Sequence, residues 1–86
     1  MLTKNQVWEI TKSFGGVAIA YNPVRDCGIY EVILPTISHK RQCAVAVTDG
    51  KDAGKDDGTE RVMKAISDRR FHVSSEDDLK QVLRKL

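Results

Sequence analysis

The chain has 86 residues, of which 41% are hydrophobic and 30% are charged, and its formal net charge is +2. This length allows one small core and leaves little volume for a deep active site, which favours binding at the surface. The composition excludes global disorder and a coiled coil, and the small net charge is not that of a dedicated nucleic-acid binder. The longest apolar run, residues 17–21, is too short to cross a bilayer, so we expect a cytoplasmic protein with no membrane partner.

The first predicted element is a helix over residues 4–14. Thr3 stands where its N-cap is needed, and Gln6 follows three residues later, as in a capping box. Apolar residues then recur at helical spacing, which predicts one buried helix face. The glycine pair at 15–16 is typical of a left-handed helix stop.

Three β-compatible runs follow, at residues 17–21, 28–34 and 42–48, and their short spacing predicts an antiparallel meander. Bulky and small side chains alternate along them, and we expect the bulky ones to pack under the helices. The bulky set is Val17, Ile19, Tyr21, Tyr30, Val32, Leu34, Val45 and Val47. The set expected to point outward is Ala18, Ala20, Ile29, Glu31, Ile33, Ala44 and Ala46.

The second half of the chain predicts a charged loop over residues 49–58, a helix over 59–69 and a short strand over 71–73. A third helix opens at residues 74–78 with serine and acidic residues, which suit a helix start. The predicted fold is a single α+β domain spanning residues 1–86. Its sheet has three or four mostly antiparallel strands, and its three helices give the order α-β-β-β-α-β-α.

Candidate catalytic groups are few. Cys27 and Cys43 should begin consecutive antiparallel strands near opposite ends of the sheet, which is too far apart for a disulfide and indicates two free thiols in a reducing compartment. Cys43 with His39 could act as nucleophile and base, although no orienting acid or oxyanion donor accompanies them. The chain is therefore expected to be no enzyme.

The loop at residues 50–55 stands between a strand and a helix, where phosphate-binding loops occur. It lacks the first glycine of that motif and the serine or threonine that would hold magnesium, because Asp49 and Asp56 occupy those positions. The histidines and cysteines lack the close pairs typical of zinc sites. We expect no cofactor and no metal.

Two binding hypotheses remain. In the first, the outward sheet face contacts another protein or a second copy of the chain, and the protein works as an inhibitor, adaptor or regulator. A competing structural interpretation is that the third helix covers this face within the same chain. In the second hypothesis, basic loops contact nucleic-acid phosphates. The residues for that contact are Arg25, His39, Lys40, Arg41, Lys51 and Lys55.

Overall fold

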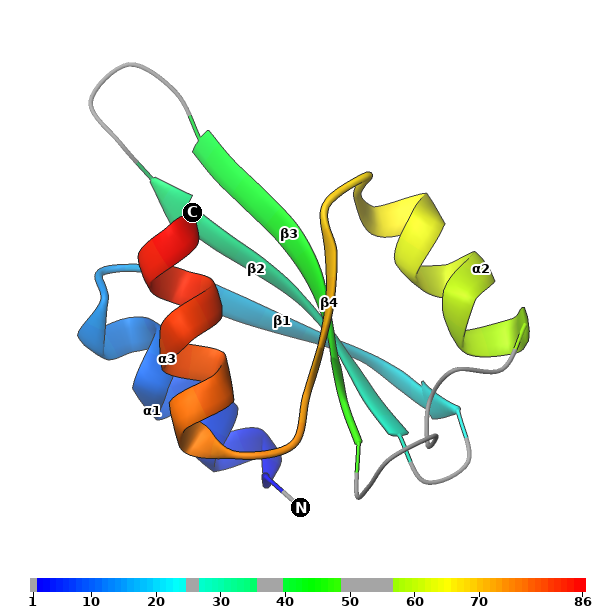
Figure 1. Cartoon of the computed structure of the whole chain (residues 1–86), viewed down its shortest axis with the longest axis horizontal. Coiled ribbons are helices and arrows are strands. Elements are labelled where there is room, and N and C mark those ends of the chain that lie inside the picture. The colour runs from blue at the N-terminus through cyan, green and yellow to red at the C-terminus, as the bar shows by residue number, and fades with distance from the viewer. Residues whose placement is uncertain (1, 25–26, 36–39, 49–56) are drawn as a thin grey trace.

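The helix predicted at the start of the chain forms α1 (Lys4–Ser13) and begins at its capping box. The Gln6 backbone N–H donates to the Thr3 hydroxyl, and the Thr3 N–H donates to the Gln6 side chain. Gly15, with a φ of 82°, then turns the chain toward the sheet. This computed structural model describes residues 2–24, 27–35, 40–48 and 57–86 (Figure 1).

One four-stranded sheet organises the rest of the chain, in the order β1-β2-β3-β4. The strands β1 (Val17–Val24), β2 (Cys27–Pro35) and β3 (Lys40–Val47) form the predicted antiparallel meander. The fourth strand, β4 (Arg70–Val73), pairs with β3 in parallel. A parallel pair needs a crossover connection, and the helix α2 (Asp57–Ile66) lies in it. The predicted α+β fold and its element order are confirmed.

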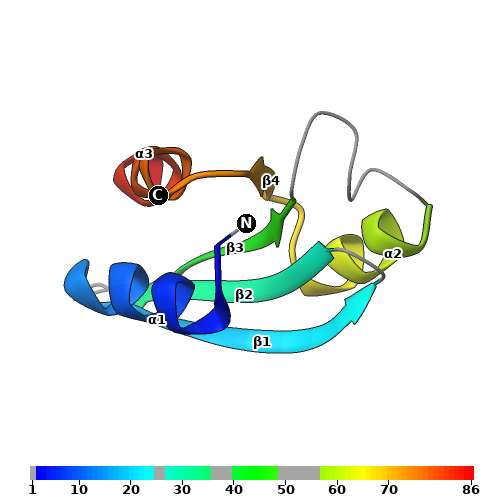
Figure 2. The same ribbon diagram turned by 90° about the horizontal axis from the view of Figure 1, so that it is seen from below.

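The helices cover both faces of the sheet. The first helix and α3 (Glu76–Lys85) lie on one face, and α2 lies on the other (Figures 1 and 2). Residues on the α1/α3 face form the larger core, in which Leu79 and Val7 meet Val32 and Val45 of the sheet. On the α2 face, Met63 of α2 packs against a second buried cluster, composed of Ile29, Ala44 and Ala46.

The side chains of β1 point to the sheet faces opposite to those predicted. Ala18 pairs with Val32, and Ala20 pairs with Tyr30, so both alanines lie on the α1/α3 face. The bulky β1 side chains Val17, Ile19 and Tyr21 therefore lie on the α2 face, where they are exposed.

The close approach of α1 explains this phase. An added Cβ at Gly16 would lie 2.6 Å from the Ile33 carbonyl oxygen and 3.2 Å from the Thr11 methyl carbon, which shows how tightly the chain turns here. Ala18, two residues later, packs against the core beside α1. A small side chain suits this position because a bulky one would hold the helix away from the sheet.

The third helix also begins as predicted. The Asp78 backbone N–H donates to the Ser75 hydroxyl, and Glu76, Asp77 and Asp78 fill the first turn, where negative charge complements the helix dipole. This helix packs on the same sheet face as α1, so the interpretation in which it covers the second face is wrong. Of the helices in the described ranges, none has the length and apolar character needed to cross a membrane.

Candidate binding surface

Exposed apolar side chains gather on the part of the α2 face that α2 leaves uncovered. Val17, Ile19 and Tyr21 of β1 are 49%, 47% and 40% exposed. Ile33 and Glu31 of β2 stand beside them, paired with Val17 and Ile19, and are partly exposed. The helix α2 packs on β2 and β3 instead. We call these five residues the open β1 surface.

The hydrogen-bond pattern of the inner strands determines which backbone groups of β1 are paired. Each strand residue directs its N–H and C=O to the same side, and consecutive residues alternate. The Ala44 N–H donates to the Arg69 carbonyl beside β4, over 2.8 Å. The backbone N–H and C=O of Val45, the next residue, therefore point toward β2, and Val45 forms a hydrogen-bonded pair with Tyr30.

The same alternation extends to the outer strand. Because the backbone N–H and C=O of Tyr30 point toward β3, those of its neighbour Glu31 point toward β1, where Glu31 pairs with Ile19. The backbone N–H and C=O groups of Ala18 and Ala20 then point away from the sheet. Among the described residues β1 ends the strand order, so these groups form an open edge of that part of the sheet (Figure 2).

Side-chain hydrogen bonds link Tyr21 and Glu31 of this surface to Gln42 of β3, and so connect three strands. The Tyr21 hydroxyl donates to the Glu31 carboxylate over 2.9 Å, and the Gln42 side-chain amide donates to the other oxygen of the same carboxylate. The hydrogen bond to Glu31 raises the pKa of the Tyr21 phenol, with smaller contributions from burial and the Glu31 charge. These hydrogen bonds hold the Tyr21 ring in place, so less side-chain conformational entropy is lost when a partner binds.

The other side of β1 carries a second exposed aromatic residue. Trp8 of α1 is 43% exposed, and the Lys12 ammonium lies 4.5 Å from its ring centroid, in a cation–π contact. Trp8 also lines a pocket of about 250 Å³. Its lining residues are Lys4, Asn5, Trp8, Ala18, Ala20 and Tyr30. Apolar surface is thus available on both sides of the open edge.

The outward set expected from the sequence does not form one surface. Ile29, Ala44 and Ala46 are fully buried beneath α2, so the expectation that they are exposed is wrong. Their small side chains instead provide the floor on which α2 packs. Ala18 and Ala20 lie on the opposite face, because the phase of β1 is reversed. Only Glu31 and Ile33 of the predicted set remain on the open β1 surface.

Most of the basic residues in the nucleic-acid hypothesis lie outside the residues that the structure describes. Arg25, His39, Lys51 and Lys55 lie outside the described residues, as do residues 49–56 of the charged loop, and the Lys40 side chain is not described either. Arg41 is described, and its guanidinium donates to the carbonyl of Leu86. This contact ties β3 to the end of the chain after α3.

Cys43 has the environment of a core residue. The side chain is fully buried on the α1/α3 face, and its thiol is free. Burial raises the pKa of this thiol to about 11, and the positive charge of Arg69 offsets part of that increase. The thiolate is the nucleophilic form of cysteine, so this environment opposes the predicted nucleophile role. His39, the predicted base, lies outside the described residues.

We expect the Cys43 thiol to resist alkylation in the folded protein. A raised pKa keeps the thiol protonated at pH 8, and burial blocks access, so iodoacetamide should react at least about 100-fold more slowly than with an exposed cysteine. The measurement is mass spectrometry of a Cys27→Ser variant, in which Cys43 is the only thiol. The same variant in guanidinium should react fully, and rapid modification of the folded protein would show an accessible thiol.

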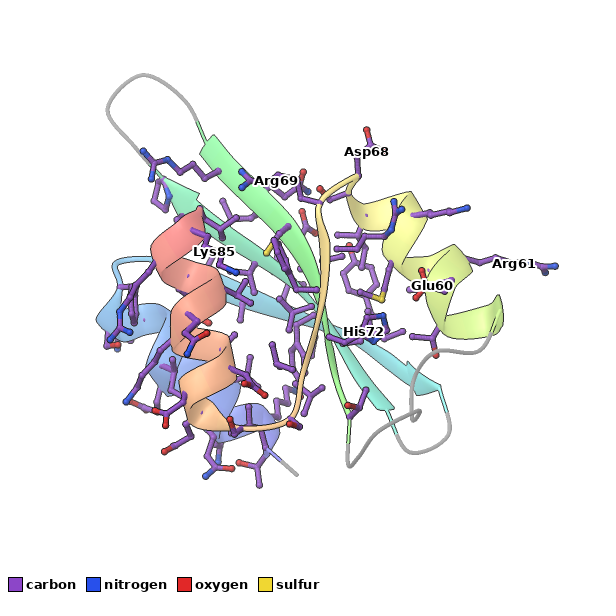
Figure 3. The ribbon with its side chains drawn as sticks, viewed as in Figure 1. Glu60, Arg61, Asp68, Arg69, His72 and Lys85 are labelled. Carbon is purple, nitrogen blue, oxygen red and sulfur yellow. The ribbon has the colours of Figure 1, made fainter. Side chains whose placement is uncertain are left out.

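A histidine–carboxylate pair joins α2 to β4, and sequence patterns did not point to it. The His72 Nε2 and Glu60 Oε1 atoms are 3.0 Å apart, and the two side chains meet between these elements (Figure 3). The residues are 12 positions apart in the sequence, so only the crossover brings them together. Within the described ranges, no group of three or more histidine, cysteine or acidic side chains could hold a metal ion.

Comparisons with known proteins add no assignment. The chain matches no protein-family model, no curated protein and no solved structure.

Proposed function

We propose that this is a small non-enzymatic cytoplasmic protein that binds another protein through the open β1 surface and the adjoining strand edge. It would work as an inhibitor, adaptor or regulator. The observation that carries the proposal is the exposure of Val17, Ile19 and Tyr21, between 40% and 49%, in one row on a strand. The free, buried thiol of Cys43 supports a reducing compartment.

An exposed apolar row on an edge strand calls for an explanation. Natural sheets protect their edge strands with charged side chains, proline, bulges or a covering segment, because an open edge pairs with other chains. The far end of β1 carries Pro23 and an irregular register between Tyr21 and Val24, but residues 17–21 contain no charge and no proline. A partner that adds a strand here would gain backbone hydrogen bonds at Ala18 and Ala20, and its alternate side chains would meet the open β1 surface.

The chemistry of this surface favours a protein over a phosphate backbone. Its exposed members are two aliphatic residues and one tyrosine, and aromatic residues are enriched at the centres of protein interfaces. Its one ionisable carboxylate, Glu31, is negative and would repel phosphate. The nucleic-acid hypothesis stays a second candidate only as an outcome of the experiment below.

The test is a comparison of immobilised wild-type protein and an Ile19→Lys variant, each exposed to lysate of the cells that produce it. A lysine at the centre of the apolar row would have to be desolvated on binding, so retained proteins should bind at least about 10-fold more weakly, or about 1.4 kcal/mol. The position is 47% exposed, and the variant should keep its stability within about 0.5 kcal/mol.

An Ala65→Lys variant is the matched control, because it places the same charge on an exposed position of α2. It should retain the same proteins as the wild type. Equal retention by wild type and Ile19→Lys would contradict the proposal. Retention of nucleic acid that weakens strongly between about 50 and 200 mM salt would instead indicate phosphate contacts.

A further inference from the structure

Resting on the proposed function, we propose that the open β1 edge binds a second copy of this chain. The two copies of β1 pair antiparallel about a two-fold axis at Ile19, and the two sheets join into one. Three properties of β1 favour this partner: the direction of its backbone groups, the order of its side chains and its lack of charge.

The backbone groups fit this register. In an antiparallel pair centred on Ile19, Ala18 of one copy lies opposite Ala20 of the other, and the reverse pair forms on the far side of the axis. Both alanines direct their N–H and C=O outward, so each pair exchanges two hydrogen bonds. Ile19 then faces Ile19 of the second copy as a non-hydrogen-bonded pair, in which side chains are closest.

The side-chain order of residues 17–21 is close to palindromic. Val-Ala-Ile-Ala-Tyr has bulky residues at the odd positions and alanine at the even ones. A two-fold axis at Ile19 therefore brings Val17 opposite Tyr21, and both pairs extend the row on the α2 face. Aromatic and β-branched residues make favourable cross-strand pairs. Each apolar row then packs along its flank against the row of the other copy.

Charge favours a second copy for a reason specific to symmetry. A two-fold axis brings each residue near its own equivalent, so a charged residue close to the axis would face a like charge. Residues 17–21 carry none. The carboxylate of Glu31, which pairs with Ile19 in the next strand, accepts hydrogen bonds from Tyr21 and Gln42.

On the other face, the alanines leave room beside the axis. Ala18 and Ala20 line the same pocket as Trp8. The two alanines of the second copy would extend that lining, so Trp8 of each copy gains apolar surface to contact. One contact between the two copies then reduces the exposure of Trp8 and of the flank of the β1 row.

Sedimentation velocity across concentrations from about 5 to about 500 µM tests the dimer, a range that covers weak interfaces of small area. Wild type and Ala65→Lys should shift from monomer to dimer as concentration rises. Ile19→Lys should remain monomeric across the range. Ala20→Pro should also remain monomeric, because proline removes the outward N–H without removing a hydrogen bond to β2. Circular dichroism verifies that each variant is folded.

A disulfide tests the register. Opposed residues of a non-hydrogen-bonded pair have Cα atoms about 4.5 Å apart, within the range that a disulfide spans. In a Cys27→Ser background, Ile19→Cys should therefore form covalent dimers on mild oxidation. Ala65→Cys in the same background should stay mostly monomeric. Failure of Ile19→Cys to cross-link overturns the register and with it the proposal.

The remaining outcomes separate this inference from the function it depends on. A wild type that stays monomeric at about 500 µM overturns the dimer, as does a dimer that survives both Ile19→Lys and Ala20→Pro. Either result leaves the lysate experiment independent of the dimer. Loss of captured proteins in the Ile19→Lys variant would still support binding of a different protein at the open β1 surface.

Discussion

Ile29→Arg is expected to unfold the domain. Ile29 is fully buried beneath α2, packed with Ala44, Ala46 and Met63. A charged guanidinium at this position would have to be desolvated, which costs about 4 kcal/mol or more. A domain of this size has a total stability of order 5–10 kcal/mol, so the loss approaches the whole. Urea unfolding followed by far-ultraviolet circular dichroism measures it.

Ile19→Arg is the matched control for that substitution. It introduces the same side chain on the same sheet face, at a position that is 47% exposed. Its stability should stay within about 0.5 kcal/mol of the wild type. If Ile29→Arg instead folded with an unchanged urea midpoint, α2 would not cover this part of the sheet, and the face would be open as the sequence pattern first indicated.

Leu79→Ala is expected to remove about 2.5 to 5 kcal/mol of stability, the second largest effect. Leu79 is fully buried on α3, in the core shared by α1, α3 and the sheet. The substitution removes apolar contacts and leaves a cavity that the surrounding strands cannot fill without moving. Thermal and urea unfolding should both show the loss.

The control for Leu79→Ala lies two residues further along the same helix. Gln81 is exposed, and Gln81→Ala changes helix propensity by only a few tenths of a kcal/mol. A similar small loss in Leu79→Ala would show that α3 packs loosely on the sheet. The pair of variants thus separates the contribution of packing from that of helix formation.

The local features of the chain were predictable because they depend on neighbouring residues. The Thr3–Gln6 capping box and the Ser75 cap each involve hydrogen bonds across three positions, and both are present in the structure. The predicted strands at residues 17–21, 28–34 and 42–48 all lie within or overlap β1, β2 and β3. Apolar periodicity and turn residues carry this information without reference to the rest of the fold.

The candidate site was less predictable because it depends on which element covers which face. Alternation in residues 17–21 shows that two faces exist, but it does not say which one a helix covers. The assumption that the bulkier face is buried failed at β1, where close packing beside α1 favours Ala18 over a larger side chain. It held at Val32 and Val45, which lie in the larger core.

The sequence by itself determined the α+β class, the element order and the caps of the first and third helices, because each follows from short-range patterns and from turn chemistry. Tertiary structure alone decided that α2 covers β2 and β3, that Ile29, Ala44 and Ala46 are core, and that β1 exposes its bulky row. The physical reason is that a sheet offers two nearly equivalent apolar faces. Their covering is chosen by helix packing between residues far apart in the chain.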